Sequence, residues 1–293
     1  MIGDLIDVLM PYLNYSKSKS GGVQKWTMEI ISSVVIAADK EIGPFFEKLM
    51  EACDYIYKNS PDSLGPVKAQ SLETIGHLSK AVGKERFAPF LEYFTKESIA
   101  IIQKETDEYS IRDSAFGYLA AITKFMKEDM AEILPIIMEA AFHTINRDDI
   151  SQPQMANPIQ EFSRDSDSEP DQEQVYGKIE AFDEKASAIH CLGYLFQFIP
   201  KLMLPYLEDL SETLLKMVQY VEDNVRFECI AAINGIALGL NQLECGEDFE
   251  WEAGFADPTP IGEETQKFLS SVYFPTVAIV FDTEDENDVI ERC

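Results

Sequence analysis

The sequence lacks the marks of several protein classes. It has no apolar run of about 18 residues, so no transmembrane helix is expected. The first residues, MIGDLIDVLMPYL, lack the basic region and the small-residue cleavage site of a signal peptide, which predicts that there is no secretory leader. The five cysteines are an odd number and form no CxxC pair, which favours reduced thiols in a cytosolic or nuclear protein.

Positive charge is also scarce. The 24 Lys and Arg residues against 52 Asp and Glu residues give a formal net charge of −28 over 293 residues. Direct binding of nucleic acid is therefore not expected, because it rests on Lys and Arg at the phosphates, and the same argument excludes an anionic membrane surface. The negative field instead favours basic partners. With 46% hydrophobic and 26% charged residues, the chain has the composition of a folded protein.

The apolar residues that are present follow the period of an α-helix. They recur every three or four positions almost throughout, as Leu72, Ile75 and Leu78 illustrate, whereas strand-like alternation is rare. Proline is tolerated in the first turn of a helix and is costly inside one. Five prolines lie near the start of an apolar helical stretch: Pro44, Pro89, Pro135, Pro205 and Pro275. These patterns predict an all-α protein.

The helical stretches also repeat. Four segments align, namely VKAQSLETIGHL, IRDSAFGYLAAI, EKASAIHCLGYL and VRFECIAAINGI, which begin at Val67, Ile111, Glu184 and Val225. Each has a basic residue in its second position, and a weaker copy precedes them. The basic residues lie 43, 44, 73 and 41 positions apart, at Lys25, Lys68, Arg112, Lys185 and Arg226. Three of these intervals match the unit of about 40–47 residues found in helical-hairpin solenoids.

This period predicts a right-handed α-solenoid of HEAT-type hairpins over residues 1–293, with about six repeats and incomplete ones at the ends. The first helix of each hairpin (helix A) begins near a proline, and the second (helix B) begins near a basic residue. Each basic side chain is expected to pack by its stem and to pair with an acidic residue of the next repeat, with ligand contact as the alternative. Residues 287–293 resemble the first turn of a further helix B, so we expect the chain to be part of a longer solenoid.

The tenth position of the aligned segments is mostly small. It is occupied by Gly76, Ala120 and Gly193, and Asn234 is the exception. A small residue here is expected to let neighbouring B helices approach closely.

Two segments interrupt the repeats. Residues 147–182 are predicted to form an acidic loop inserted within one hairpin, between a helix A at about 128–146 and a helix B at about 183–199. The acidic side chains at its centre are Asp165, Asp167, Glu169, Asp171 and Glu173. Residues 242–262 are predicted to be an irregular acidic connection.

The search for chemistry is negative. The three histidines (His77, His143 and His190) fall on separate predicted helices, and no HExxH or zinc-spaced Cys/His cluster occurs. Neither a phosphate-binding glycine loop nor a GxSxG motif is found, and the acidic loop lacks the ligand spacing of a calcium-binding hand. We therefore expect no enzymatic activity, no cofactor and no metal.

The remaining candidate is a surface. In a stacked solenoid the B helices line the concave side, and their positions between the core columns face the groove. The candidate partner contacts are Glu73, His77, Tyr118, His190 and Tyr194. An ordinary solvated face is the alternative for any one of them. Together with the net charge, they predict an acidic groove for a basic ligand.

The stretch Phe182–Ile236 resembles a pair of HEAT repeats from the middle of importin-beta (karyopherin-beta) superfamily receptors. An acidic insert precedes the sequence FDEKA, and a helix B containing LG follows it. A helix A that starts with proline comes next, and the sequence NVR opens a second helix B. This arrangement is similar to import receptors that carry ribosomal proteins and histones.

The resemblance implies a nuclear transport receptor that moves between cytoplasm and nucleus. Such receptors bind basic protein cargo and the GTP-bound small GTPase Ran, whose best-defined site lies in the N-terminal repeats. They cross the pore through contacts with phenylalanine–glycine repeats of nucleoporins.

The resemblance also suggests that the acidic loop residues contact cargo or Ran, with a disordered tether as the alternative. Two other functions share the general repeat pattern. One is a scaffold of another complex, such as a phosphatase regulatory subunit, and the other is a solenoid that flanks an enzyme domain.

Overall fold

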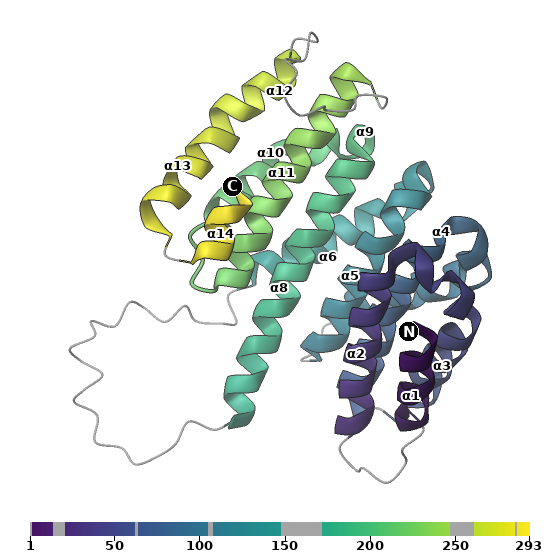
Figure 1. The fold of residues 1–293 in the computed structure, drawn as a ribbon. Helices are drawn as coiled ribbons and strands as arrows, with labels where there is room; N and C mark the ends of the chain where they lie inside the picture. The colour runs from purple at the N-terminus through teal and green to yellow at the C-terminus, as the bar shows by residue number, and fades with distance from the viewer. Residues whose placement is uncertain are drawn as a thin grey trace, which may run out of the picture.

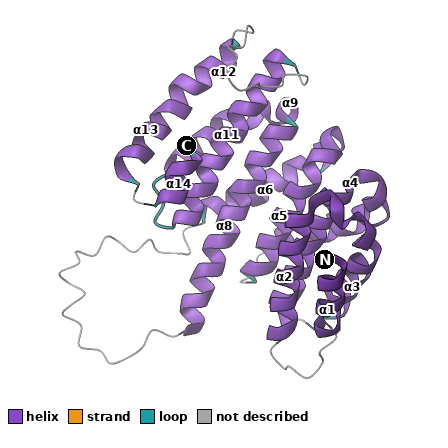
Figure 2. Cartoon of the chain, viewed as in Figure 1, coloured by secondary structure: helices purple, strands orange, loops and turns teal. Residues whose placement is uncertain are grey.

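A computed structural model describes residues 2–13, 21–61, 64–104, 108–147, 172–246, 261–284 and 286–293, and only the backbone of residues 172–178. These parts of the chain are helical and contain no strand (Figures 1 and 2). The all-α solenoid predicted from the period is confirmed. The hairpins follow one another in space in chain order, as the colour gradient of Figure 1 makes visible.

Six A helices and six B helices alternate within the described residues. Helix A is in turn α1 (Ile2–Leu13), α3 (Phe46–Asn59), the second half of α4 (Gly65–Ile102), α6 (Leu134–Asn146), α10 (Leu207–Met217) and α13 (Phe274–Thr283). Helix B is α2 (Gly22–Ala38), the first half of α4, α5 (Tyr109–Met126), α8 (Gln172–Phe198), α11 (Asp223–Cys245) and α14 (Asn287–Arg292). Consecutive B helices pack side by side, from α2 through to α14.

Short elements connect these helices. They are the 3₁₀ turns η1 (Asp39–Phe45), η3 (Lys127–Glu132) and η4 (Leu204–Tyr206), the helices α9 (Pro200–Met203) and α12 (Glu263–Phe268), and the π-helical turn η5 (Leu269–Tyr273). Four of the five marked prolines lie in a first helical turn or in a 3₁₀ turn that leads into helix A. The fifth, Pro89, lies inside α4, after Gly83. Gly83 has φ 76°, a left-handed conformation that favours glycine, and it joins a helix B directly to the next helix A.

The column of basic residues links the hairpins. Arg112 is buried and donates from Nε to Oε1 of Glu184 on the next helix B at 2.6 Å. Arg226 likewise pairs with Glu284, which follows α13, at 2.6 Å. The predicted pairing with an acidic residue of the next repeat is therefore confirmed at these two positions. Lys68 instead lies over the Tyr57 ring, 4.9 Å from its centroid.

Residues of the same column also cap the C-terminal ends of the A helices. Sequence reasoning did not predict this second role. Arg112 donates to the Ile102 carbonyl at the end of α4 at 2.8 Å, and Lys185 donates to the Ile145 carbonyl near the end of α6 at 2.6 Å. Arg226 donates to the Tyr220 carbonyl, beyond α10, at 2.9 Å. The last carbonyls of a helix have no partner within it and carry its negative dipole end, so a cation there stabilises helix A.

Glycines set the closest approach of two B helices, α8 and α11. A Cβ built on Gly193 would lie 2.6 Å from Cα of Ala232, which confirms the predicted role of the small tenth residue. On α11 the close approach falls one position after Asn234, because a Cβ on Gly235 would lie 2.7 Å from the Gly193 carbonyl oxygen. A Cβ on Gly239 would overlap the Phe196 carbonyl oxygen.

Helix α8 begins at Gln172, eleven residues before the predicted start at 183. The segment QEQVYGKIEAF is rich in Glu, Gln, Lys and Ala, whose helix propensity extends α8 into what was predicted to be loop. In Figure 1 this end of α8 projects past its neighbours. At the second predicted irregular segment, α11 continues to Cys245, and Oε1 of Glu244 accepts the backbone N–H of Glu264 at the start of α12 at 2.9 Å.

Candidate partner-binding surface

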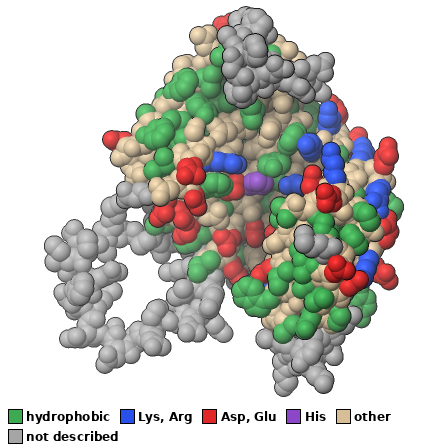
Figure 3. Space-filling view, viewed as in Figure 1, with side chains coloured by type: hydrophobic (Ala, Val, Ile, Leu, Met, Phe, Trp, Pro, Cys, Tyr) green, Lys and Arg blue, Asp and Glu red, His purple; other side chains and the backbone are tan. Residues whose placement is uncertain are grey.

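The B helices α4, α5, α8 and α11 present one continuous stripe of side chains, here called the inner surface. The face seen in Figure 3 is hollowed near its centre, where a histidine lies among acidic and basic side chains. Four contacts on or between helices establish the stripe: Ser187 with Asp113, His190 with Glu228, Lys80 with Tyr194, and Lys124 with Phe198. The stripe includes Glu73, His77, Lys80, Asp113, Gly117, Lys124, Asp183, Ser187, His190, Tyr194, Phe198, Glu222 and Glu228.

Carboxylates cross this surface from one B helix to the next. We call Glu73, Asp113, Asp183 and Glu222 the acidic row, because they lie on or beside four successive B helices. Burial raises the pKa of Asp113 to about 7, and the negative charges of Glu73 and Asp183 contribute to that shift. Burial also raises the pKa of Glu222, as does the neighbouring charge of Asp183. The carboxylates of the acidic row therefore lie close enough for their negative charges to repel one another.

The charge of Asp113 makes stability depend on pH. Its pKa of about 7 in the folded chain lies above the ordinary value of 3.8, so the folded state keeps this proton longer than the unfolded state. The free energy of unfolding therefore falls as the pH rises from about 4 to about 7, and the loss is complete above that range.

We expect Asp113→Asn to stabilise the chain at pH 8 and to change nothing near pH 4. The amide removes the buried charge and keeps an oxygen that can accept the Ser187 hydroxyl. Thermal unfolding of both proteins at several pH values between 4 and 8 measures the difference. A difference that is the same at every pH would contradict the assignment.

Two histidines on the inner surface lie beside carboxylates. His190 Nδ1 is 2.8 Å from Oε2 of Glu228, and the imidazole stacks on Tyr194 with ring centroids 4.5 Å apart. His77 Nε2 lies 3.5 Å from Oε1 of Glu73. Each histidine thus has a carboxylate neighbour on the inner surface.

Two lysines lie towards the other end of the stripe. The Lys80 ammonium is 4.9 Å from the Tyr194 ring centroid, and the Lys124 ammonium is 5.7 Å from that of Phe198. The two rings are neighbours on α8, with centroids 5.5 Å apart. We call these four residues the lysine corner. The inner surface is therefore not uniformly acidic.

Four of the predicted contacts lie on the inner surface: Glu73, His77, His190 and Tyr194. Tyr118 does not, because it is fully buried and its ring packs beside those of Phe87 and Phe94. Adjacent helical positions point about 100° apart, so Gly117 takes the inner position and Tyr118 turns into the core. Asp165, Asp167, Glu169 and Asp171 lie outside the described residues, as does the side chain of Glu173, whose backbone is in the first turn of α8.

Sequence reasoning missed Asp113, Asp183 and Glu222 in the acidic row, and it missed Lys80, Lys124 and Phe198 in the lysine corner. A signal for the lysines is present, since Lys80 and Lys124 each lie twelve positions after the basic residue of their repeat, Lys68 and Arg112. No comparable signal exists for Asp113, because its environment depends on how α4, α5 and α8 are stacked.

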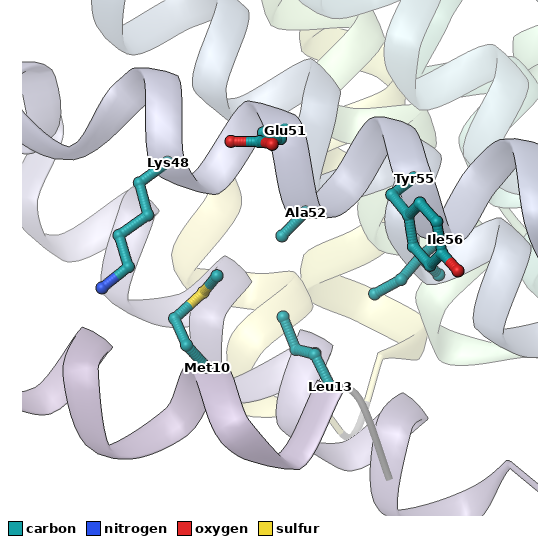
Figure 4. Close-up of a pocket in the computed structure, with 7 residues that line it drawn as sticks. All are labelled: Met10, Leu13, Lys48, Glu51, Ala52, Tyr55 and Ile56. Atoms are coloured by element: carbon teal, nitrogen blue, oxygen red, sulfur yellow. The ribbon is translucent and has the colours of Figure 1, made fainter. Parts of the chain in front are cut away.

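The opposite side of the solenoid has pockets between neighbouring A helices. One of about 290 Å³ lies between α1 and α3 and is lined by Met10, Leu13, Lys48, Glu51, Ala52, Tyr55 and Ile56 (Figure 4). Another of about 250 Å³ lies between α6 and α10 and is lined by Phe142, Asn146, Asp209, Glu212 and Thr213. Most side chains that line the first pocket are aliphatic or aromatic. The lining of the second pocket includes the carboxylates of Asp209 and Glu212.

The described parts of the chain contain neither a candidate metal cluster nor a candidate membrane-spanning helix. No group of three or more His, Cys, Asp or Glu side chains there could hold a metal ion. No helix in the described ranges is long and apolar enough to cross a bilayer.

Solved structures with a similar fold are repeat solenoids. A designed armadillo repeat protein matches 100% of this chain and 96% of its own with a TM-score of 0.50 at 12% sequence identity. An engineered protein matches 99% and 93% with a TM-score of 0.51 at 10% identity. At such low identity these likenesses concern the fold alone.

Two curated relatives are similar in sequence, whereas no protein-family model matches the chain. The probable importin subunit beta-4 of Schizosaccharomyces pombe is 23% identical over 295 positions, which cover 96% of this chain and 27% of that protein. Human importin-4 is 29% identical over 101 positions, which cover 34% of this chain and 9% of that protein. The chain thus spans about a quarter of the first relative, and both relatives agree with the resemblance carried by Phe182–Ile236. In sequence the chain is similar to these two importins, and in fold it is similar to helical repeat solenoids.

Proposed function

We propose that this chain is part of a nuclear import receptor that binds basic protein cargo, of the ribosomal-protein or histone type, on its inner surface. The observation that carries the proposal is the acidic row, which crosses four successive B helices in a chain with a net charge of −28. The importin names of the two relatives support the choice of a transport receptor over a general scaffold.

The row suits a Lys- and Arg-rich segment. Its carboxylates already repel one another, so each cation that binds relieves repulsion as well as forming its own pair. Burial raises the pKa of Asp113, and a bound cation would lower it again and favour the charged form. Long-range attraction would speed association and fade with added salt.

Passage through the pore would use the opposite side. The pockets between α1 and α3 and between α6 and α10 are large enough for an aromatic ring, and each lies between two adjacent A helices. A phenylalanine of a phenylalanine–glycine nucleoporin would bury its ring there, with little dependence on salt. Because cargo and nucleoporin use opposite sides, the receptor could hold both and shuttle between cytoplasm and nucleus.

Release would follow from Ran in its GTP form. Each hairpin contacts its neighbours alone, so many small changes at the interfaces alter the curvature of the solenoid. Ran-GTP and cargo would favour different curvatures or overlapping surfaces, and each would then weaken the other by the same factor.

The test is fluorescence anisotropy with a labelled Lys/Arg-rich histone-tail peptide, at low and at physiological salt, with and without excess Ran-GTP. We expect salt-sensitive binding that Ran-GTP displaces. The variant E73Q/D113N/E222Q should bind about tenfold more weakly, since three charge pairs at the surface together supply about 1–2 kcal/mol. A phenylalanine–glycine peptide should bind the same protein, which a scaffold subunit would not do.

The matched control removes three acidic side chains on the side of the A helices. E132Q/E139Q/E208Q changes the net charge equally and should leave peptide binding close to wild type. An equal loss of peptide affinity in both variants would mean that net charge alone causes the effect. Failure of the wild-type chain to bind the peptide at low salt would overturn the proposal. A complex that Ran-GTP leaves intact would overturn the release step alone.

A further inference from the structure

The lysine corner is at odds with a surface built for cations. Within the ranges that the structure describes, neither Lys80 nor Lys124 is paired with a carboxylate, and their contacts are with the rings of Tyr194 and Phe198. By contrast, Lys48, Lys84 and Lys96 each pair with an acidic side chain. Two unneutralised ammonium groups therefore lie together on the inner surface of a strongly acidic chain.

The surroundings of these lysines leave the pair accessible to an anion. The side chain of Lys80 on α4 reaches across α5 to the Tyr194 ring on α8. It can do so because α5 has the small residues Gly117 and Ala121 at this point, and no described atom lies within 4 Å of a Cβ built on Gly117. Burial lowers the pKa of Lys80, and the nearby charge of Lys124 lowers it further. An anion that bound both ammonium groups would relieve their repulsion and need not displace an existing ion pair.

The distance between the lysine corner and the acidic row indicates that the anion and the basic residues can belong to one bound segment. From Glu73 to Lys80, and from Asp113 to Lys124, the separation along the helices is about 10–17 Å at 1.5 Å per residue. An extended peptide covers that distance with about three to five residues. One bound segment can therefore reach both places.

We propose that Lys80 and Lys124 bind a carboxylate side chain of the partner segment, about three to five residues away from the basic residues that occupy the acidic row. This inference rests on the proposed function and adds a specificity to it. A segment with basic residues alone meets repulsion at the lysine corner, whereas a segment with a correctly spaced Asp or Glu is neutralised at both ends.

The experiment compares two labelled peptides on the 293-residue chain. Both carry five consecutive Lys and Arg residues, and four positions before them one has glutamate and the other glutamine. We expect the glutamate peptide to bind about fivefold more tightly, which corresponds to one partly screened charge interaction. In K80Q/K124Q the preference should vanish, and the glutamine peptide should bind at least as well as it does to wild type.

The control is K201Q/K216Q, which removes two lysines of α9 and α10 on the side of the A helices that form no ion pair among the described residues, and it should keep the preference. Equal affinities for the two peptides on wild type would overturn the inference and leave the proposed function standing. A preference that survives in K80Q/K124Q, or that is lost in the control, would also overturn it. Failure of both peptides to bind would overturn the proposed function itself.

Discussion

Replacing Arg112 with methionine is expected to lower the free energy of unfolding by about 3–5 kcal/mol. The substitution leaves the fully buried Glu184 carboxylate without its closest cation and frees the carbonyl of Ile102 at the end of α4. Because Arg147 still donates to Oε2 of Glu184 at 2.9 Å, the loss should fall towards the lower end of that range. Methionine keeps most of the apolar stem, so the change reports the charge rather than lost packing.

Chemical denaturation measures this loss, with Arg86→Met as the matched control. Arg86 also pairs with a glutamate, Glu47, at 2.5 Å, but the side chains of that pair are 42% and 72% exposed, so its removal should hardly move the unfolding midpoint. Adding Glu184→Gln to Arg112→Met should recover part of the stability, since a neutral amide costs less to bury than a charge. A loss for Arg112→Met no larger than that for Arg86→Met would contradict the role given to this network.

Replacing Gly239 with alanine is expected to destabilise the chain by about 1–3 kcal/mol, although alanine is normally the better residue inside a helix. The added methyl group would meet the Phe196 carbonyl oxygen, which belongs to the backbone of α8 and cannot rotate away. Helices α8 and α11 would have to separate along their whole contact, which loosens the packing on both sides of it.

Gly117→Ala provides the opposite result on a neighbouring helix. No atom lies within 4 Å of a Cβ built there, so the substitution should stabilise α5 by up to about 1 kcal/mol through helix propensity. Thermal unfolding of the two variants in parallel separates packing from propensity. A Gly239→Ala variant as stable as the wild type would show that the α8–α11 approach does not limit stability, and a destabilised Gly117→Ala variant would contradict the open space at that position.

The sequence was most informative where one periodic pattern repeats. The spacing of Lys68, Arg112 and Arg226 predicted the hairpins and the ion pairs between repeats, because a repeated environment selects the same residue type each time. It did not predict that Arg112, Lys185 and Arg226 also bind carbonyls at the ends of the A helices, since that depends on the angle between the helices of one hairpin.

The misses have two physical causes. A shift of one position turns a helical side chain by about 100°, which separates Gly117 from Tyr118 and Gly235 from Asn234. The early start of α8 has another cause, because local helix propensity outweighed the polar composition of the segment after Gln172. The meeting of Asp113 with Ser187, or of Lys80 with Tyr194, joins residues from different hairpins, and no pattern within one hairpin encodes it.

The basic column makes the solenoid a rod of uneven stiffness. Arg112, Lys185 and Arg226 each tie one hairpin to the next, through Glu184, the Tyr220 ring and Glu284. The two earlier members of the column stay within their own hairpin, Lys25 with Glu29 and Lys68 with Tyr57. We therefore expect the junctions between the hairpins from the second half of α4 onwards to resist bending more than the two earlier junctions, which lack a link from this column.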